Sequence, residues 1–584
     1  MHTKQRFDAV LVSQIEHEES IEMKTKRHNV AGTAALSAAG LIACAGSFAH
    51  SAVTYRAVAL SGTSGPLGPG MGSQVYGDLS SASAGINNAG AVIFRSATTD
   101  TTNSAGVWVN TSGTNGVIAF AGQNAPDGVA YSNAGFNAPN INNAGHTAWR
   151  QATNAMFGNS GGSDGMIART TTDAPGTGGA TTQSLSFPAP LLSQDGRAAY
   201  IGSLTLNTGN PPVTFTAPNA NNGGLWIGAP GAMNLALRQN DAVTALAGDG
   251  SIRVGSFTSS GLAVSNGGRF ASLNALQGSV TTGAATGNDQ AILSNRTGTL
   301  EVIARRGDQV PGAAPGTFYR ALGTSMGMNN AGRVVFSSTL RDGAGTTITN
   351  GSLITDNSGS LGLVAQGGMP LPGITNANGN EFVGVNWGSS FSDPVISGNN
   401  IVAFKTGGLT GTGVTPQNSN AIFTLNDSGT FTKMMRTDDV APVGLADDGT
   451  LIRYGGLQGG LSVNTRGQVA FTSLLSGFGV NGLIGNNLAL FATDLSGQVQ
   501  LIVRRGTDFE VAPGDVRLVT SIGGLNTSGG QDGRAVSLNN YSEVVFSLGF
   551  ADGTSGVFTA TVPAPAGAAA LGLAGLFAAR RRRG

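Results

Sequence analysis

Asn87-Asn-Ala-Gly90-Ala-Val-Ile-Phe94 is the first copy of a short motif that recurs along this 584-residue chain. Three further strong copies pair an Asn with a Gly three residues later, namely Asn142 with Gly145, Asn329 with Gly332 and Asn464 with Gly467. Weaker copies begin at Ser193, Ser265, Ser397 and Asn539. Successive copies start 51 to 75 residues apart. The chain between its two ends is therefore predicted to contain eight similar modules.

The motif has the chemistry of a turn that leads into a strand. A type I turn favours Asn, Asp or Ser at its first position, where a short side chain caps the amides of the turn, and Gly at its fourth. Asn400 replaces that Gly in one copy, and Asn tolerates a left-handed backbone better than most residues. The apolar residues that follow are typical of a strand entering a core.

Each module holds enough further apolar stretches for about four strands. In one example, residues 291–293 and 300–305 form two apolar runs separated by a polar turn, downstream of the motif. Four strands in some 65 residues fit one blade of a β-propeller better than one coil of a parallel β-helix. We predict an all-β protein, a propeller of about eight four-stranded blades. Seven blades with one module as an insertion, or a two-part or solenoid arrangement, are the alternatives.

The eighth module lacks its last strand, and a candidate for that strand stands at the other end of the body. Residues 54–62, followed by Pro69-Gly70, resemble the closing strand and turn of a module with no beginning. We expect this strand to pair with the end of the eighth module and close the ring without a covalent bond. The predicted propeller spans residues 53–562.

Residues 1–52 form a predicted signal region. Basic residues at 24–27 precede an apolar stretch at 30–43 and small residues at 47–52, the order of a secretory signal. The acidic stretch before them fits no signal, so Met23 is a hypothetical start of translation. The chain's one cysteine, Cys44, lies in Leu41-Ile-Ala-Cys44, which resembles a bacterial lipoprotein box; the alternative is an ordinary signal residue discarded at export. We expect export through the Sec pathway to the cell surface, the outer membrane or the extracellular matrix.

Residues 563–584 form a predicted sorting or anchor segment in three parts. Pro563 and Pro565 precede the apolar residues 566–579, and four basic residues end the run, Arg580, Arg581, Arg582 and Arg583. This order resembles the PEP-CTERM tail, which implies processing by an exosortase-type enzyme in a diderm bacterium. That family usually has Glu where this chain has Ala564, so a variant enzyme and a retained membrane anchor are both open. A buried core helix is a further alternative, which the four arginines disfavour.

The repeats themselves resemble the tandem NxxGxxAF repeats of bacterial secreted proteins that carry interchangeable C-terminal anchors. The resemblance covers nearly all of residues 53–562. It implies an exported surface protein and nothing catalytic.

The composition narrows the function. Charged residues make up 11% of the chain, with 32 Lys and Arg against 32 Asp and Glu, and removal of both ends leaves a slightly acidic body. Such a body is not expected to bind nucleic acid. Four of the five histidines and the one cysteine lie in residues 1–52. The body therefore lacks the parts for thiol chemistry, His-based triads and His-rich zinc sites.

Few other residues suggest a site. Asp438, Asp439, Asp447 and Asp448 are weak candidates for calcium, with a solvated acidic loop as the favoured alternative. Trp387 has no equivalent in other modules and is the candidate for stacking on a sugar ring, whereas Trp149 and Trp226 occupy core positions of strands.

Most acidic residues of the body suggest structural roles. Asp241, Asp308 and Asp439 each follow an Arg by three residues, which suggests local ion pairs that stabilise turns. The run Ser193-Gln-Asp-Gly-Arg resembles the Asp box of sialidase propellers, itself a turn element.

We therefore predict a binding or structural module at the cell surface or in the matrix, associated with polysaccharide and without catalysis or cofactor. The alternative function is a polysaccharide-acting glycoside hydrolase or lyase with its carboxylates on one propeller face.

Overall fold

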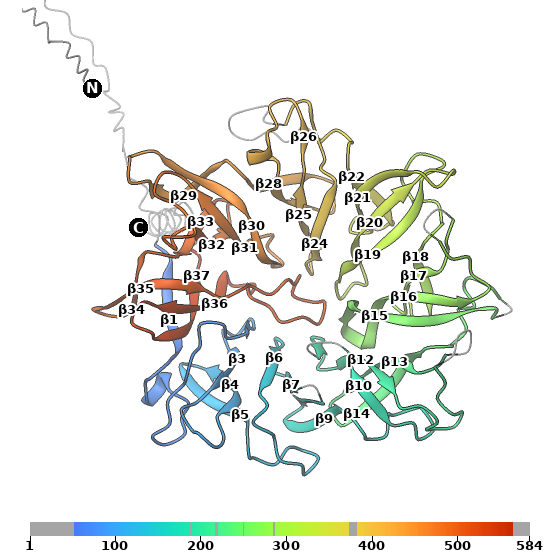
Figure 1. Ribbon diagram of the computed structural model, residues 1–584, viewed down its shortest axis with the longest axis horizontal. Helices are drawn as coiled ribbons and strands as arrows, with labels where there is room; N and C mark the ends of the chain where they lie inside the picture. Colours follow the sequence, from blue (N-terminus) through green and yellow to red (C-terminus); the bar gives the residue numbers. More distant parts are fainter. Residues whose placement is uncertain are drawn as a thin grey trace, which may run out of the picture. The chain divides into compact units, whose positions relative to one another are not determined.

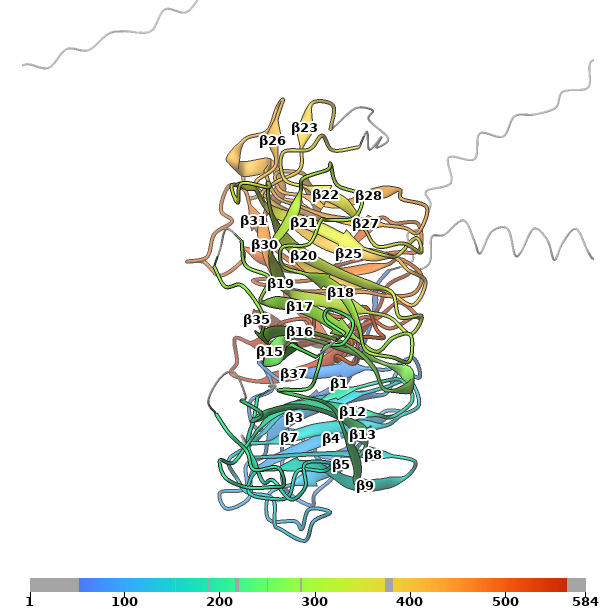
Figure 2. The same cartoon turned by 90° about the vertical axis from the view of Figure 1, so that its right-hand side faces the viewer.

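The computed structural model describes residues 52–563, apart from residues 153, 187–189, 216–219, 249, 284–285 and 373–381. Met23, Cys44, Pro565, residues 566–579 and the four arginines at 580–583 lie outside the described residues. The described residues form eight sheets of four or five strands arranged in a ring, an eight-bladed β-propeller (Figure 1). The predicted fold class is confirmed. Figure 2 shows the ring edge-on.

The first four blades follow one another along the chain, each an antiparallel sheet. Blade 1 consists of β2 (Ala84–Ile86), β3 (Val92–Ala97), β4 (Ala105–Thr111) and β5 (Thr114–Phe120). Blade 2 consists of β6 (Phe136–Ile141), β7 (Thr147–Gln151), β8 (Ala155–Ser160) and β9 (Ser163–Arg169). Blade 3 consists of β10 (Thr182–Leu185), β11 (Leu191–Leu192), β12 (Ala198–Leu204), β13 (Gly223–Ala229) and β14 (Ala232–Arg238). Blade 4 consists of β15 (Ile252–Ser265), β16 (Arg269–Gly278), β17 (Gln290–Ser294) and β18 (Glu301–Arg305).

The other four blades complete the ring. Blade 5 consists of β19 (Phe318–Met328), β20 (Val334–Arg341), β21 (Thr347–Thr355) and β22 (Gly362–Gln366). Blade 6 consists of β24 (Ser390–Ile396), β25 (Val402–Gly407), β27 (Ala421–Leu425) and β28 (Phe431–Arg436), with a separate ribbon of β23 (Val385–Asn386) and β26 (Thr410–Gly411). Blade 7 consists of β29 (Val440–Leu445), β30 (Leu451–Val463), β31 (Val469–Ser476), β32 (Leu488–Thr493) and β33 (Val499–Arg504). Blade 8 consists of β34 (Asp508–Ala512), β35 (Asp515–Ile522), β36 (Glu543–Phe550), β37 (Ser555–Thr561) and β1 (Thr54–Leu60). Three short 3-10 helices are η1 (Gly65–Leu67), η2 (Asn266–Gly268) and η3 (Pro416–Asn418).

The first strand of the body closes the ring, as the sequence predicts. β1 pairs antiparallel with β37, with Thr54 opposite Thr561 and Leu60 opposite Gly556. The two ends of the propeller therefore lie side by side on blade 8.

The hydrophobic core is divided into eight clusters, each between two neighbouring blades. One cluster joins Val545 and Val557 of blade 8 to Phe94 and Trp108 of blade 1, so the seam is packed like the other interfaces. Apolar side chains on both faces of a sheet find a partner only when the neighbouring blade is present. Stability is therefore shared around the ring.

The repeated motif forms the turn that leads into β3, β7, β12, β16, β20, β25, β31 and β36. The Gly90 N–H donates to the Asn87 carbonyl over 3.1 Å, and the Asn87 side-chain oxygen accepts from the N–H groups of Ala89 and Ala91. The fourth position has a left-handed backbone, with φ of +74° at Gly90 and +61° at Asn400. The substitution of Gly by Asn is thus explained as predicted.

Candidate functional site

The repeat asparagines also join each blade to the next. The Asn87 side-chain amide donates to the Asn142 carbonyl over 3.1 Å, while its oxygen caps its own turn. The same bond recurs from Asn142 to Ser193 (2.8 Å), from Asn329 to Ser397 (2.9 Å), from Asn464 to Asn539 (2.9 Å) and from Asn539 to Asn87 (3.0 Å). All five side chains are buried. We call these side chains the latch asparagines.

A second set of bonds runs in parallel one residue further on. The Asn88 N–H donates to the side-chain oxygen of Asn143 over 2.9 Å, and the Asn540 N–H donates to that of Asn88 over the same distance. Equivalent main-chain donors and side-chain acceptors are Asn143 and Gln194, Asp195 and Asn266, Asn266 and Asn330, and Thr465 and Asn540. Each donor belongs to one blade and its acceptor to the next along the ring, so these bonds link the turns in one direction from blade 7 through blades 8 and 1 to blade 5.

In the turn that begins with Ser193, a carboxylate replaces the amide. Asp195 accepts from the Ser193 hydroxyl in its own turn and from the Gly267 N–H of blade 4, over 2.8 Å. Burial raises the pKa of Asp195, but these hydrogen bonds and Arg197 outweigh it, so the pKa lies below its ordinary value. The run that resembles an Asp box is therefore a link between blades.

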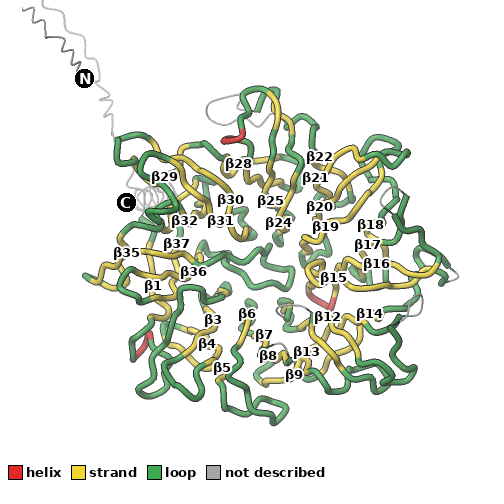
Figure 3. Tube along the Cα trace, in the orientation of Figure 1, coloured by secondary structure: helices red, strands yellow, loops and turns green. Residues whose placement is uncertain are grey.

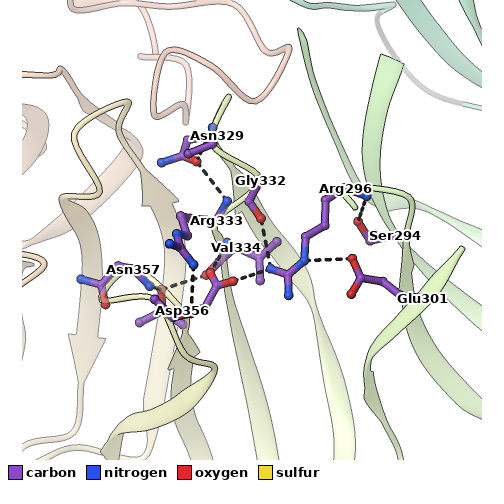
Figure 4. A network of polar contacts seen from close by, with 12 residues as sticks. Ser294, Arg296, Glu301, Asn329, Gly332, Arg333, Val334, Asp356 and Asn357 are labelled. Carbon is purple, nitrogen blue, oxygen red and sulfur yellow. Dashed lines mark hydrogen bonds and ion pairs between the residues drawn. The ribbon is translucent and has the colours of Figure 1, made fainter. Parts of the chain in front are cut away.

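A further link joins blades 4 and 5 (Figure 4). Arg296, from the turn between β17 and β18, forms an ion pair with buried Asp356 and lies 3.1 Å from Glu301. Asp356 in turn accepts from the Val334 N–H over 2.6 Å, at the start of β20. The guanidinium thus ties the outer hairpin of one blade to the second strand of the next.

A long loop of blade 8 crosses the middle of the ring. Residues 523–538, which we call the plug, leave β35 and run toward β15 before they return to β36 (Figure 3). The plug binds the inner strands of other blades through main-chain atoms. The Gly533 carbonyl accepts from the N–H of Leu192 over 2.7 Å, and the Val536 carbonyl accepts from that of Ile86 over 2.9 Å.

Other plug residues form hydrogen bonds with blades 4, 5 and 7. Ser528 pairs in parallel with Ser462 of blade 7, and the Asp532 carbonyl accepts from Val264 of blade 4. Gln531 accepts from the Asn330 N–H over 3.0 Å. Because the neighbouring turn of blade 6 has Gly398 at this place, the plug supplies the acceptor that this turn lacks.

An ion pair anchors the tip of the plug. Asp532 is 0% exposed and lies 2.7 Å from Arg534, and it also accepts from the Ser528 hydroxyl over 2.8 Å. Arg534 donates to the carbonyls of Met326 and Leu262, both over 2.9 Å. A carboxylate with this many partners is stable away from water.

The plug forms one wall of a central cavity of about 290 Å³. Ser83, Asn140, Ser260, Ser325, Asp393 and Asn526 are among its polar lining residues, and Leu191, Met326 and Pro394 are among the apolar ones. These residues come from blades 1 to 6 and from the plug, so the cavity exists only in the closed ring.

The charged side chains that line the cavity already have partners. Asp393 lies 2.7 Å from the buried Lys405 ammonium group, and Arg534 is paired with Asp532. Among the described lining residues, Asp393 is the one carboxylate. The lining thus supplies no pair of carboxylates of the kind that glycoside hydrolysis uses.

Trp387 is a core residue, which corrects the expectation that it stacks on a ligand. Its side chain is 2% exposed and packs among Phe391, Phe404, Phe423 and Phe431, with ring centroids 5.1 to 5.8 Å away. No face of the indole is open to a sugar. Trp149 and Trp226 are buried, as expected.

The four aspartates proposed for calcium have separate protein contacts. Asp439 lies 2.9 Å from Lys433, Asp438 lies 3.9 Å from Arg453, and Asp448 accepts from Thr450. Asp447 lies beside Gly479. In the part of the chain that the structure describes, no three His, Cys, Asp or Glu side chains are grouped to hold a metal ion.

The predicted turn ion pairs have a different geometry. Asp241 accepts from the main-chain N–H of Arg238 over 2.6 Å, and Asp439 does the same with Arg436. Each guanidinium Nε instead donates to a main-chain carbonyl 17 or 18 residues earlier, from Arg238 to Asn221, Arg305 to Asn288, Arg436 to Asn418 and Arg504 to Asn486. Arg238 and Asp241 also attract each other electrostatically, as do Arg305 and Asp308, so in these turns the guanidinium interacts with both the backbone and the nearby carboxylate.

Sequence reasoning missed the plug and the amide donors. A signal for the plug was present, because Gln531-Asp-Gly-Arg534 repeats Gln194-Asp-Gly-Arg197 of blade 3. Both glutamines accept from the main chain of a preceding turn. Of the predicted sorting residues, the structure describes Pro563 alone. Within the described ranges, no helix is both long and apolar enough to cross a bilayer.

Several solved structures are similar to this chain at low identity. A puromycin-hydrolysing peptidase of Mycobacterium tuberculosis has 10% identity and a TM-score of 0.33, with 77% of this chain and 56% of that chain covered. The β-propeller domain of the Trilobed protease from Pyrococcus furiosus has 8% identity and a TM-score of 0.34, with 72% of this chain and 95% of that chain covered. Trypanosoma rangeli sialidase has 12% identity and a TM-score of 0.27, with 70% of this chain and 57% of that chain covered.

The chain spans little more than half of the peptidase and of the sialidase, and similarity this weak carries no argument about activity. No curated protein matches the chain. The model of one family matches residues 27–205 and 86–569, which together include the whole propeller with its repeated turns. The chain therefore belongs to this family of unknown function (DUF7453).

Proposed function

We propose that this protein is an exported propeller that works as a binding or structural module at the cell surface or in the extracellular matrix, in association with polysaccharide and without catalysis. The observation that carries the proposal is the pairing of Thr54 with Thr561. Because both ends of the propeller lie on blade 8, a tether after Pro563 would hold the ring at one point of its rim.

The described site supports a binding role over a catalytic one. Its acidic and basic side chains are paired with one another, and the plug forms hydrogen bonds with blades 1, 2, 3, 4, 5 and 7. Enzymes that act on glycosides need two carboxylates flanking the bond. The cavity lining described above offers Asp393 alone.

Delivery is the second part of the proposal. Residues 1–52 act as a Sec signal, and residues 563–584 are sorted by an exosortase-type enzyme or retained as an anchor through residues 566–579. The four arginines at 580–583 stop transfer on the cytoplasmic side of the membrane.

Surface display is tested with an epitope inserted after Leu483, a fully exposed side chain in a loop of blade 7. The full chain is expressed in a diderm bacterium with an exosortase-type enzyme, and antibody binding to intact cells is compared with binding to lysed cells. We expect labelling of intact cells or of the matrix, and loss of labelling when Arg580 to Arg583 are all replaced by Ala. Labelling confined to lysed cells would refute the proposal.

Polysaccharide association has its own assay. Purified full chain is sedimented with the extracellular polysaccharide of the same host, with bovine serum albumin as the control. Retention of the propeller but not of albumin is expected, and a propeller that stays in solution would leave a purely structural role.

A further inference from the structure

Unpaired hydroxyl groups converge on the central cavity. Ser260 and Ser325 lie where the pairing of β15 and β19 with the next strand is interrupted, between Phe257 and Leu262 and between Leu322 and Met326. An interruption of this kind can turn a side chain out of the ladder. Ser83, from just before β2, lines the same cavity. In the described part of the chain, none of these three hydroxyls makes a hydrogen bond.

Amide groups add acceptors to the same space. Asn526 donates to the Ala84 carbonyl over 2.7 Å, and Asn140 donates to the Gly533 carbonyl over the same distance. Each amide nitrogen therefore has at least one partner within the protein. Their side-chain oxygens make no hydrogen bond within the described residues, so each offers an acceptor to the cavity.

The charges of the cavity cancel. Arg534 is neutralised by buried Asp532, and Asp393 is neutralised by Lys405, each over 2.7 Å. A charged ligand would therefore lose its hydration without gaining a free counter-charge. The desolvation free energy of a neutral ligand is much smaller.

Size and shape restrict the ligand further. A volume of about 290 Å³ is at the lower limit of ligand pockets, which are typically about 300 to 1,000 Å³. Leu191, Met326 and Pro394 add apolar surface to the lining, beside its hydroxyl and amide groups. One face of a sugar ring is apolar and its edge carries hydroxyls, which can both donate and accept.

From these four observations we propose that the central cavity binds a single uncharged sugar ring, held by the hydroxyls of Ser83, Ser260 and Ser325 and by the side-chain oxygens of Asn140 and Asn526. This site would give the proposed polysaccharide association a specific binding place. The inference rests on that association only for the source of the sugar. The plug contributes Asn526, Thr527, Arg534 and Ala535 to the lining of this cavity.

The test is titration of the full chain with monosaccharides, followed by saturation-transfer NMR and calorimetry. The probes are glucose, galactose and N-acetylglucosamine as neutral sugars, with glucuronate and glucosamine as charged ones. We expect saturable binding of at least one neutral sugar and binding of the charged analogue that is at least tenfold weaker. Failure of every neutral sugar to bind, or tighter binding of a charged one, would overturn the proposal.

Variants then place the binding in the cavity. Ser325→Phe fills the space and should abolish binding, whereas Ser476→Phe, at an exposed serine outside the cavity, should leave it unchanged. Ser260→Ala and Ser325→Ala, which change little volume, should each weaken binding about three- to tenfold through one lost hydrogen bond. Equal binding by wild type and both Ser325 variants would refute the assignment of the site.

The outcome is separable from that of the polysaccharide assay. Binding of a neutral sugar that Ser325→Phe abolishes upholds the cavity site even if the propeller fails to sediment with the host polysaccharide. Sedimentation that Ser325→Phe leaves intact, in a protein that binds no monosaccharide, upholds the proposed function and refutes the cavity site.

Discussion

The side-chain amide of Asn539 donates to the main-chain carbonyl of Asn87 over 3.0 Å, and so joins the last repeat turn to the first across 452 positions of the chain. Together with the pairing of β1 and β37, this bond means that the propeller is closed twice. The sheet of blade 8 closes it at the rim, and the latch asparagine Asn539 closes it between the last turn and the first.

The latch predicts a specific cost for losing the amide donor. Asn87→Asp keeps the oxygen that caps the turn but turns an anion toward the Asn142 carbonyl, so the free energy of unfolding should fall by about 1 to 3 kcal/mol. The measurement is urea unfolding at pH 7. Asn137→Asp is the control, since Asn137 is exposed and makes no side-chain hydrogen bond among the described residues; an equal loss in both variants would contradict the latch.

The seam predicts a disulfide. Thr54 and Thr561 are exposed and directly opposite in the ladder, so Thr54→Cys/Thr561→Cys in a Cys44→Ser background should oxidise within one chain. Constraint of so long a loop should stabilise the protein by several kcal/mol in the chain-entropy model, about 4 or more. Mobility on a non-reducing gel and the midpoint of thermal unfolding report the bond. A mixture of reduced chains and intermolecular dimers would show that β1 does not lie on β37.

Two glycines of the plug are expected to respond differently to substitution by Ala. A Cβ at Gly529 would collide with the main chain of Ile396 in blade 6, whereas a Cβ at Gly524 meets nothing within 4 Å. Gly529→Ala should therefore destabilise the protein by about 1 to 3 kcal/mol, while Gly524→Ala should be neutral or slightly stabilising. Chemical unfolding of the two variants side by side tests whether the plug crosses the ring as described.

The ion pair at the tip of the plug predicts strong coupling. Asp532→Ala removes the partner of Arg534 from a fully buried position and should cost about 3 to 5 kcal/mol. The double variant Asp532→Ala/Arg534→Ala should cost less than the sum of the two single variants, because it leaves no unpaired charge. Strictly additive losses in the double-mutant cycle would argue against the pair.

The edge of blade 8 predicts a dependence on pH. The Arg517 guanidinium contacts Asp515 over 2.6 and 3.0 Å and holds the pKa of that carboxyl below its ordinary value of 3.8. The unfolded chain then binds more protons in this range, so the pair stabilises the fold above about pH 4 and its contribution is lost as the pH falls through the lowered pKa.

Unfolding midpoints of wild type and Arg517→Gln should therefore differ at pH 6 and converge at pH 2.5. Arg333→Gln is the matched control, because Arg333 donates to the Gly359 carbonyl and has no ion pair in the described part of the chain. A difference between wild type and Arg517→Gln that persists unchanged at pH 2.5 would assign the effect to packing.

The blades and the seam were predictable because short stretches of sequence specify both. A turn with Asn and Gly at defined positions, followed by an apolar run, specifies a hairpin wherever it occurs, and eight copies specify eight blades. The eighth module lacks one strand and residues 54–60 form one strand without a module, so the sequence predicts that the two pair.

The latch and the plug were harder to predict because they depend on distant partners. A type I turn accepts Asn, Asp and Ser alike at its first position, so the turn alone does not reveal that the amide of Asn87 has a second partner in blade 2. A bias toward Asn in the strong copies was the available hint. The prediction that Trp387 binds a ligand was wrong for a related reason. An aromatic residue without an equivalent in other modules can still be buried, and four phenylalanines pack on Trp387.

The pairing of β1 with β37 sets an order of events for a chain that crosses a membrane from its N-terminus. If the chain is exported as proposed, β1 emerges first and stays unpaired while about 500 residues follow it. Seven blades can assemble during that delay, yet neither end of the growing arc is covered until the final hairpin arrives. Periplasmic chaperones would therefore be needed most by the earliest part of the polypeptide, and a protein truncated near its C-terminus would expose the apolar side of its first blade to proteases.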